Sequence, residues 1–320
     1  MLDLTMKKAA AFFKKRNNFL IVSHASPDAD TIGSAAALVK GLRSLGKKAD
    51  AICDEAIPKK LAFLDAECCF VETEPAGTET YISVDTASAS MLGGLAGKYT
   101  VERVFDLSID HHMVNSIPCE RRLLHIDYSS CGEIIFELLI EMGVKMTKSI
   151  ATSLYGAMSS DSGGFRFSST RGETMRYAAV LMETGIDFAK INRLLFETKT
   201  PSQIALERFA YNSIELFLGG RLAIIAFKKD DLSTVNAEES DIDSINQIPR
   251  QISGVEVSAI IRPKGDKVKV SLRSNDYFNV AAFASELFGG GGHHHAAGCS
   301  FEGDVDEVKR IIVEALEGKL

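Results

Sequence analysis

The chain has 320 residues, of which 46% are hydrophobic and 25% are charged. This length exceeds what one hydrophobic core usually serves, and the composition is that of a globular protein, so we expect two folded domains rather than a disordered or fibrous chain. The formal net charge of −7 argues against binding of long nucleic acid, because such binding depends on many Lys and Arg contacts to phosphates. Short phosphorylated ligands remain possible.

The opening segment MLDLTMKKAAAFFKKR alternates apolar and basic residues at helical spacing and lacks the continuous apolar run of a signal peptide. No other segment approaches the run of about 18 apolar residues that a membrane span needs, so we expect a cytoplasmic protein without a membrane partner. The six cysteines form no C-x-x-C pair, which favours reduced and mostly buried thiols over a zinc ribbon or a disulfide scaffold.

Up to about residue 185, short β-type runs alternate with helical patterns. This alternation predicts an α/β domain with a doubly wound, mainly parallel sheet and helices on both faces. Ligands of such sheets bind outside the carboxyl ends of the strands, so polar residues at those ends are candidates for a site. The predicted strands are 19–24, 48–53, 80–85 and 101–110, and the predicted helices are 31–45, 88–97, 131–143, 147–160 and 171–185.

The remaining sequence predicts a smaller α+β domain. It contains a hairpin over 254–274, then a helix, a glycine run and a closing helix at 304–318. The segment before it has helical periodicity and is not rich in Gly, Pro or Ser, which predicts a helical connector rather than a flexible linker. The expected organisation is a first domain at 1–185, a connector at 186–215 and a second domain at 216–320.

The first predicted strand leads into SHASPDADTIGS, which places His24, Asp28 and Asp30 within seven residues at a strand-to-helix turn. One imidazole and two carboxylates can converge there on a divalent cation such as Mn²⁺ or Mg²⁺. For this segment alone the simpler explanation is favoured, in which Asp30 only caps the following helix.

Two further predicted strands end in the same residue types, and together they favour a metal site. TYISVD ends at Asp85, and FDLSID ends at Asp110, which is followed by His111 and His112. A further carboxylate, Asp161, ends a helical segment and precedes two glycines that let the backbone pass close to a ligand. Two divalent ions in such a cluster would polarise a phosphoryl oxygen and activate water for attack at phosphorus.

The motifs H-x-x-x-D-x-D, V-D-T, D-H-H and G-G-G-G-H-x-x-A-A-G follow one another between His24 and Gly298. In this order and at this spacing they resemble the DHH phosphoesterase family with a C-terminal DHHA1 domain. The length is similar to that of the nano-RNase branch, which degrades very short RNA and dephosphorylates adenosine 3′,5′-bisphosphate. The resemblance implies two Mn²⁺ ions, with Mg²⁺ or Co²⁺ as possible replacements, and short RNA oligonucleotides or small adenine nucleotides as partners.

The resemblance also implies two metal positions that share Asp85 as a bridge. Asp110 would orient the metal-bound His111. His112 would contact the scissile phosphate or assist the leaving oxygen. The first ion would be held by His24, Asp28 and Asp85, and the second by Asp30, Asp85, His111 and Asp161.

In the second domain, the resemblance assigns substrate recognition to the run GGGGHHHAAG. Consecutive glycines expose backbone N–H groups that can hold an anion. Arg273, at the end of a predicted strand, is the best candidate to bind a terminal phosphate, whereas Arg262 could equally be a solvated surface residue. The assigned positions in the run are Gly290, Gly291, Gly292 and the motif histidine His293, with His294 and His295 at variable positions.

Three functions are consistent with these motifs. The first is a 3′–5′ exonuclease of short RNA that also hydrolyses adenosine 3′,5′-bisphosphate. The second keeps the chemistry but acts on cyclic di-AMP or its linear product pApA. The third, a non-catalytic nucleotide-binding protein, is disfavoured because no expected metal ligand is missing. A homodimer is expected only from the frequency of dimers among soluble proteins.

Overall fold

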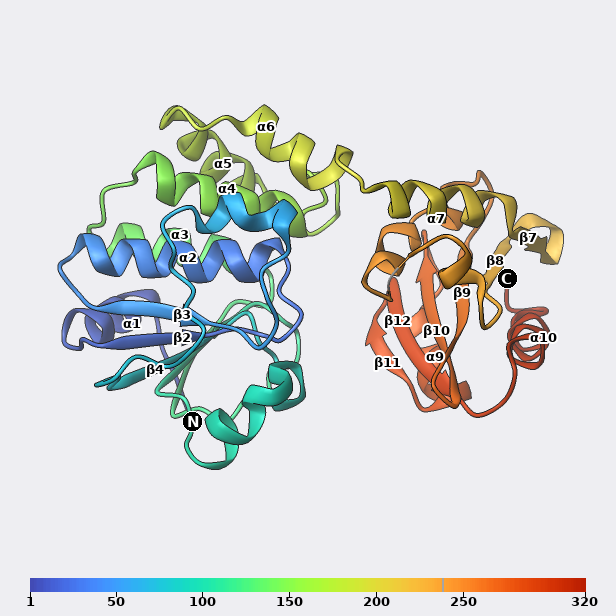
Figure 1. Ribbon diagram of the computed structural model, residues 1–320, viewed down its shortest axis with the longest axis horizontal. Coiled ribbons are helices and arrows are strands. Elements are labelled where there is room, and N and C mark those ends of the chain that lie inside the picture. The colour runs from blue at the N-terminus through green and yellow to red at the C-terminus, as the bar shows by residue number, and fades with distance from the viewer. Residues whose placement is uncertain (238) are drawn as a thin grey trace. The chain divides into compact units, whose positions relative to one another are not determined.

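The computed structural model describes residues 1–237 and 239–320, apart from the side chains of Glu239, Ser240, Asp243 and His293. The chain divides into two compact units, Met1–Thr198 and Lys199–Leu320, and each unit has hydrophobic cores of its own (Figure 1). The first unit ends within the predicted connector 186–215. Among the described helices, none has both the length and the apolar character needed to cross a membrane.

The first unit is built on a parallel sheet of six strands. These are β1 (Leu2–Asp3), β2 (Phe19–Val22), β3 (Ala49–Ile52), β4 (Thr80–Val84), β5 (Leu107–Asp110) and β6 (Arg121–Leu124). The strand order is β1–β6–β5–β4–β2–β3, and each neighbouring pair is parallel. Because β3 and β4 pair with opposite edges of β2, the order reverses between β2 and β4, which is where such sheets bind ligands.

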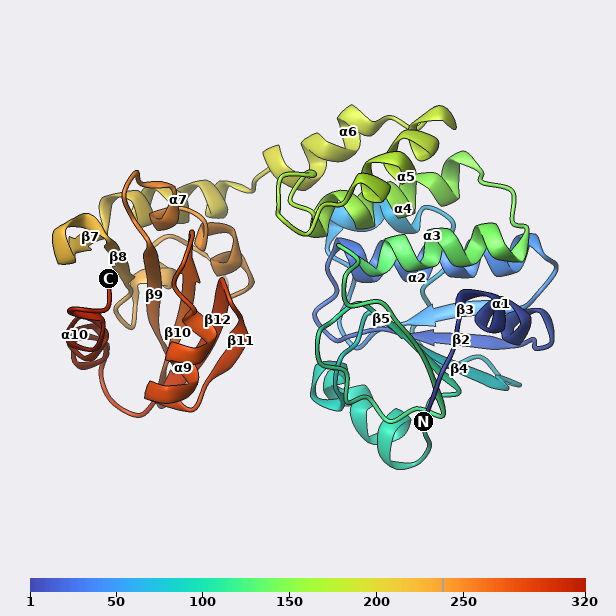
Figure 2. The same ribbon diagram turned by 180° about the vertical axis from the view of Figure 1, so that it is seen from behind.

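Helices cover this sheet, as the βα alternation predicts. They are α1 (Met6–Lys14), α2 (Ala29–Ser44), α3 (Cys131–Met142), α4 (Lys148–Asp161), α5 (Gly172–Glu183) and α6 (Phe188–Asn192). One face of the sheet, with Ile21 and Ile109, packs against α1, α2 and α3. A further layer formed by α4, α5 and α6 lies over α2 and α3 (Figure 1, Figure 2). The predicted doubly wound α/β fold is therefore confirmed.

The opposite face of the sheet is covered differently from the prediction. Leu20 and Val22 pack there against short helical turns at Ala89–Leu95 and Gly97–Val101, where the sequence predicts one helix at 88–97. The helix breaks at Gly93, whose φ of +56° is not helical. A Cβ at this position would lie 2.5 Å from Asp54 Oδ2, so the close approach of the two segments requires glycine.

The second unit contains a mixed sheet of six strands in the order β11–β12–β10–β9–β8–β7. The strands are β7 (Ile214–Phe217), β8 (Leu222–Ala226), β9 (Val257–Lys264), β10 (Lys267–Ser274), β11 (Gly291–His293) and β12 (Ala296–Phe301). The predicted hairpin is β9–β10. One face packs against α9 (Val280–Phe288) and α10 (Val305–Leu316), and the other packs against α7 (Pro201–Asn212). This is the predicted α+β architecture.

Candidate metal centre

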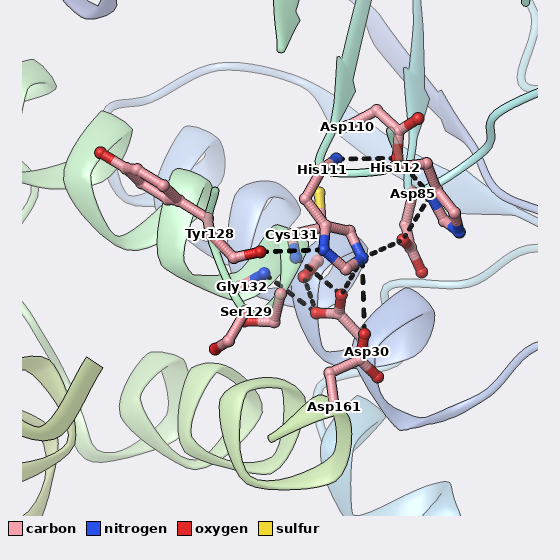
Figure 3. Close-up of polar contacts among 12 residues, drawn as sticks. Asp30, Asp85, Asp110, His111, His112, Tyr128, Ser129, Cys131, Gly132 and Asp161 are labelled. Carbon is pink, nitrogen blue, oxygen red and sulfur yellow. Dashed lines mark hydrogen bonds and ion pairs between the residues drawn. The ribbon is translucent and has the colours of Figure 1, made fainter. Parts of the chain in front are cut away.

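Six side chains that the sequence predicts as metal ligands converge at one edge of the parallel sheet, on both sides of the point where the strand order reverses. Three follow the carboxyl ends of neighbouring strands, and the others lie at helix ends. They are His24 after β2, Asp28 and Asp30 at the start of α2, Asp85 after β4, His111 after β5 and Asp161 at the end of α4. Figure 3 shows four of them, Asp30, Asp85, His111 and Asp161, pointing toward one another.

The potential ligand atoms form three overlapping groups, one of which joins Asp85, His111 and His112. Within each group, one ligand atom of every residue lies within 4.8 Å of the others. Of the other two groups, one is His24, Asp28 and Asp85, and the other is Asp30, His111 and Asp161. The groups meet because His111 Nε2 lies 3.6 Å from Asp85 Oδ1 and 3.4 Å from Asp161 Oδ2. The six predicted ligands therefore lie close together, and the assignment of each to one of two ions stays a prediction.

Asp85 is buried and lies near ligand atoms of more than one group. Its Oδ2 accepts a hydrogen bond from Thr31 Oγ1 at 2.7 Å, whereas its buried Oδ1 has no hydrogen-bond partner among the described residues. An unpartnered carboxylate oxygen in a protein interior is costly unless a cation binds it. Asp85 also has a φ of +53°, a left-handed conformation that is uncommon for residues other than glycine and that recurs at functional sites.

The carboxylates of the cluster disfavour one another's ionisation. Burial, followed by repulsion from neighbouring carboxylates, raises the pKa of Asp30 and of Asp161 well above the usual value. Burial and the charge of Asp28 also raise the pKa of Asp85. A divalent cation would remove this repulsion, and a set of carboxylates and imidazoles suits hard or borderline ions such as Mg²⁺ and Mn²⁺. The residues present therefore fit a metal centre.

Asp30 is held by a helix that is distant in sequence. The backbone N–H groups of Cys131 and Gly132, at the start of α3, donate to its carboxylate at 2.7 and 2.9 Å (Figure 3). Ser34 Oγ donates to Asp30 Oδ1 at 2.9 Å. The N-cap of α2 is Asp28, which accepts from the N–H of Thr31 at 2.9 Å. The alternative explanation, in which Asp30 only caps its own helix, is therefore wrong.

Asp110 contacts a different histidine ring from the expected one. Its Oδ1 lies 2.7 Å from His112 Nδ1 and accepts a bond from the backbone N–H of His111 at 2.9 Å. The ring of His111 instead has its Nδ1 3.3 Å from the carbonyl oxygen of Tyr128 (Figure 3). The expectation that Asp110 orients the His111 ring is wrong, because the short D-H-H turn directs the two rings to different partners.

The Asp110–His112 pair is strongly polarised. The hydrogen bond to Asp110 is the largest cause that raises the pKa of His112 to about 9. Burial acts to raise the pKa of Asp110, but the hydrogen bonds of His112 and Asn115 outweigh it and lower that pKa. His112 also lies near Asp85 and His111, but its Nδ1 is already bonded to Asp110. Asp110 therefore orients the His112 ring through Nδ1.

Three contributors to the cluster are absent from the sequence prediction. The hydroxyl of Thr31 contacts both His24 Nε2 and Asp85 Oδ2. Asn115 Nδ2 donates to Asp110 Oδ2 at 2.7 Å, and Tyr128 contributes only its carbonyl oxygen. Thr31 is easy to locate in the sequence, because it directly follows the last aspartate of the first motif. No pattern of residue types identifies a backbone carbonyl such as that of Tyr128.

In the second unit, the predicted substrate-binding residues lie on or next to strands of one sheet, with β12 between β10 and β11. Arg273 of β10 pairs in register with Ala296 of β12, and Ala296 pairs with His293 of β11. The side chain of His293 is outside the described part of the structure. Arg262 of β9 is buried, so the alternative that it is a solvated surface residue is wrong.

The glycine run has a packing role that the sequence does not reveal. A Cβ on Gly292 would lie 2.3 Å from the carbonyl oxygen of Ala296, and a Cβ on Gly290 would lie 2.5 Å from that of Gly298. A Cβ on Gly291 would meet nothing within 4 Å. Two of the three glycines are thus required by the close pairing of β11 with β12, whether or not their N–H groups also bind an anion.

Comparison with known proteins agrees with these features. The model of the DHH family N-terminal domain matches residues 18–158, and the model of the DHHA1 domain matches residues 227–319. The bifunctional oligoribonuclease and PAP phosphatase NrnA of Thermus thermophilus is 32% identical over 305 residues, which cover 94% of this chain and 89% of that protein.

Two solved structures are also similar to this chain. An exopolyphosphatase-related protein from Bacteroides fragilis aligns with a TM-score of 0.88 and 26% identity, covering 98% of this chain and 95% of that one. The RecJ protein of Thermus thermophilus in complex with Mn²⁺ shares the fold, with a TM-score of 0.59 and 14% identity over 98% of this chain and 55% of that one. The family models and the relative from Thermus thermophilus show that this chain belongs to the DHH family, as a phosphoesterase with a C-terminal DHHA1 domain.

Proposed function

We propose that the protein degrades short RNA oligonucleotides from the 3′ end and dephosphorylates adenosine 3′,5′-bisphosphate, with two Mn²⁺ ions bound around Asp85. Mg²⁺ or Co²⁺ would replace Mn²⁺ with altered activity. The proposal includes a cytoplasmic location for this activity. The first ion is assigned to His24, Asp28 and Asp85, and the second to Asp30, Asp85, His111 and Asp161.

The buried Asp85 carboxylate carries this proposal, because it belongs to two of the three ligand groups and its Oδ1 has no hydrogen-bond partner among the described residues. Two ions at such a site supply Lewis-acid polarisation of a phosphoryl oxygen and an activated water for in-line attack. The protein's own part is to hold the ligands in place. Thr31 fixes Asp85 Oδ2, and the start of α3 fixes the Asp30 carboxylate.

His112 and Asp110 have a separate role in the proposal. The Asp110 carboxylate orients the ring through Nδ1 and favours its protonated form. The other ring nitrogen, Nε2, then carries a proton that it donates to the scissile phosphate or to the leaving oxygen. This assignment needs no serine or cysteine nucleophile.

The choice of substrate rests on the relative and on the second unit. The relative from Thermus thermophilus is named as an oligoribonuclease and PAP phosphatase and is similar along 94% of this chain. Arg273 would bind a terminal phosphate as a bidentate donor, together with His293 and the N–H groups of β11, and Arg262 is a further candidate. A few such contacts suffice for a short substrate despite the net charge of −7.

A parallel assay of four substrates tests the proposal. Metal-stripped protein is re-supplied with Mn²⁺ and given 5′-labelled RNA di- to pentanucleotides, adenosine 3′,5′-bisphosphate, pApA or cyclic di-AMP. We expect stepwise release of mononucleotides from the RNA and phosphate from the bisphosphate. Preferential hydrolysis of cyclic di-AMP or pApA would replace the RNA assignment with a second-messenger one. Intact short RNA after prolonged incubation would refute it.

A further inference from the structure

The segment 127–133, which leads from the loop after β6 into the first turn of α3, contacts two of the proposed metal ligands through its backbone. The carbonyl oxygen of Tyr128 lies 3.3 Å from His111 Nδ1, and the N–H groups of Cys131 and Gly132 donate to the Asp30 carboxylate (Figure 3). Groups that bond to metal ligands orient them and tune their affinity for the ion. The position of this one segment therefore sets the orientation of two ligands that come from different elements.

Glu133 fixes this segment from inside the protein. Its side chain is fully buried on the first turn of α3. Glu133 Oε1 accepts hydrogen bonds from the backbone N–H and the hydroxyl of Ser129 and, at 2.7 Å, from Thr174 Oγ1. Glu133 Oε2 accepts from Arg171 Nη2 at 2.5 Å. The carboxylate thus ties the segment to the first turn of α5, about 40 residues further along the chain.

Arg171 contacts the same segment at three points. Besides Glu133, its guanidinium lies 3.8 Å from Asp127 Oδ2 and 3.9 Å from the centre of the Tyr128 ring. Arg171 is also the N-cap residue of α5, and its N–H is bonded to Thr174 Oγ1. One arginine therefore spans the segment from the residue before Tyr128 to the first turn of α3.

We propose that Arg171 is a positioning residue for the metal centre. It acts through Glu133 and Tyr128 to hold the segment 127–133, so that the Tyr128 carbonyl orients His111 and the start of α3 holds Asp30. Arg171 itself is neither a ligand nor a substrate contact. The inference rests on the proposed metal-dependent function, and it adds to that function a residue that controls how tightly the ions bind.

Direct titration of metal-stripped protein with Mn²⁺, followed by calorimetry and electron paramagnetic resonance, tests this proposal. Arg171→Gln is expected to weaken Mn²⁺ binding by about 10-fold, the lower end of the effect of outer-shell changes. At a fixed Mn²⁺ concentration, kcat for short RNA falls because less of the variant holds its ions. KM changes little because no substrate contact is removed. The matched control is Arg176→Gln on the same helix, whose exposed ion pair with Glu173 lies outside the network and whose loss leaves Mn²⁺ affinity unchanged.

A second variant separates positioning from folding. Arg171→Gln leaves Glu133 buried without its cationic partner, which lowers stability. Thr174→Val removes a neutral donor to Glu133 and the acceptor of the Arg171 N–H but keeps the ion pair, so it should fold and weaken Mn²⁺ binding in the same direction by a smaller factor. Folded variants that bind Mn²⁺ as tightly as wild type would overturn this inference and leave the proposed function unaffected. Wild-type protein that binds no Mn²⁺ would overturn the proposed function, and the inference with it.

Discussion

At the scale of single residues, Asp85 shows why a metal centre explains the cluster better than separate structural roles do. The residue is buried, its backbone is in the left-handed region, and one carboxylate oxygen lacks a hydrogen bond from the described residues. Each property is unfavourable for a purely structural aspartate. All three are consistent with a carboxylate shared by two cations.

Replacement of Asp85 by asparagine should separate function from stability. Asp85→Asn keeps the shape and the oxygen that accepts from Thr31 but removes the charge, so we expect Mn²⁺ affinity and kcat to fall by more than about 100-fold. Burial raises the pKa of Asp85, which means that its ionised form is disfavoured in the fold. The metal-free variant should therefore be at least as stable as metal-free wild type in urea unfolding. A variant with wild-type Mn²⁺ affinity would contradict the bridging assignment.

Replacement of His112 should affect catalysis without affecting metal binding. Its Nδ1 is bonded to Asp110, and we assign its Nε2 to the substrate. His112→Asn should lower kcat by about 100-fold or more, the usual range for loss of a general acid, with an unchanged Mn²⁺ titration. A variant that loses its Mn²⁺ binding instead would identify His112 as a ligand.

The sequence predicts the residues of the site better than their contacts. His24, Asp28 and Asp85 are recognisable because acidic and histidine residues recur where predicted strands end. The partners of His111 and His112 are not recognisable, because two adjacent histidines differ only in how the backbone turn directs their rings. Long-range contacts such as the one between Tyr128 and His111 require the fold itself.

At the scale of elements, the sequence predicts strands with a mostly apolar run, such as β2, and misses short or glycine-rich strands, such as β1 and β11. FLIV of β2 and LAIIA of β8 are almost continuously apolar, as strands buried on both faces must be. The two-residue β1 and the glycine-rich β11 have no such pattern, because hydrogen bonds to a neighbouring strand, rather than side-chain burial, define them. The sequence pattern of AAGCSF in β12 is equally weak, yet its pairing with β10 makes it a central strand.

The glycines of β11 permit a test at this scale. Gly292→Ala would place a Cβ against the carbonyl oxygen of Ala296, so we expect the free energy of unfolding to fall by about 1–3 kcal/mol. Gly291→Ala meets no atom within 4 Å and serves as the matched control with nearly unchanged stability. Urea unfolding of both variants provides the comparison. Equal losses would show that the close pairing of β11 and β12 does not explain the glycine run.

At the scale of the whole molecule, the acidic net charge is compatible with a phosphate substrate because bound metal ions would offset the repulsion. A chain with a net charge of −7 and a cluster of neighbouring carboxylates repels a phosphate substrate unless cations intervene. The sequence predicts two folded parts from length and from the change in pattern, and the structure places the boundary between its two compact units at Thr198. The boundary cannot be located more closely from the sequence, because the region around it is helical and has no run of glycine or proline residues.

The most direct test of the account is to measure hydrolysis and Mn²⁺ binding together on metal-stripped protein. Increasing amounts of Mn²⁺ are added while cleavage of a labelled RNA dinucleotide and the number of bound ions are followed. We expect no turnover without metal, and turnover that rises to saturation as two ions bind to each chain. Undiminished turnover in excess chelator, or full activity with a single bound ion, would contradict a dinuclear phosphoesterase centred on Asp85.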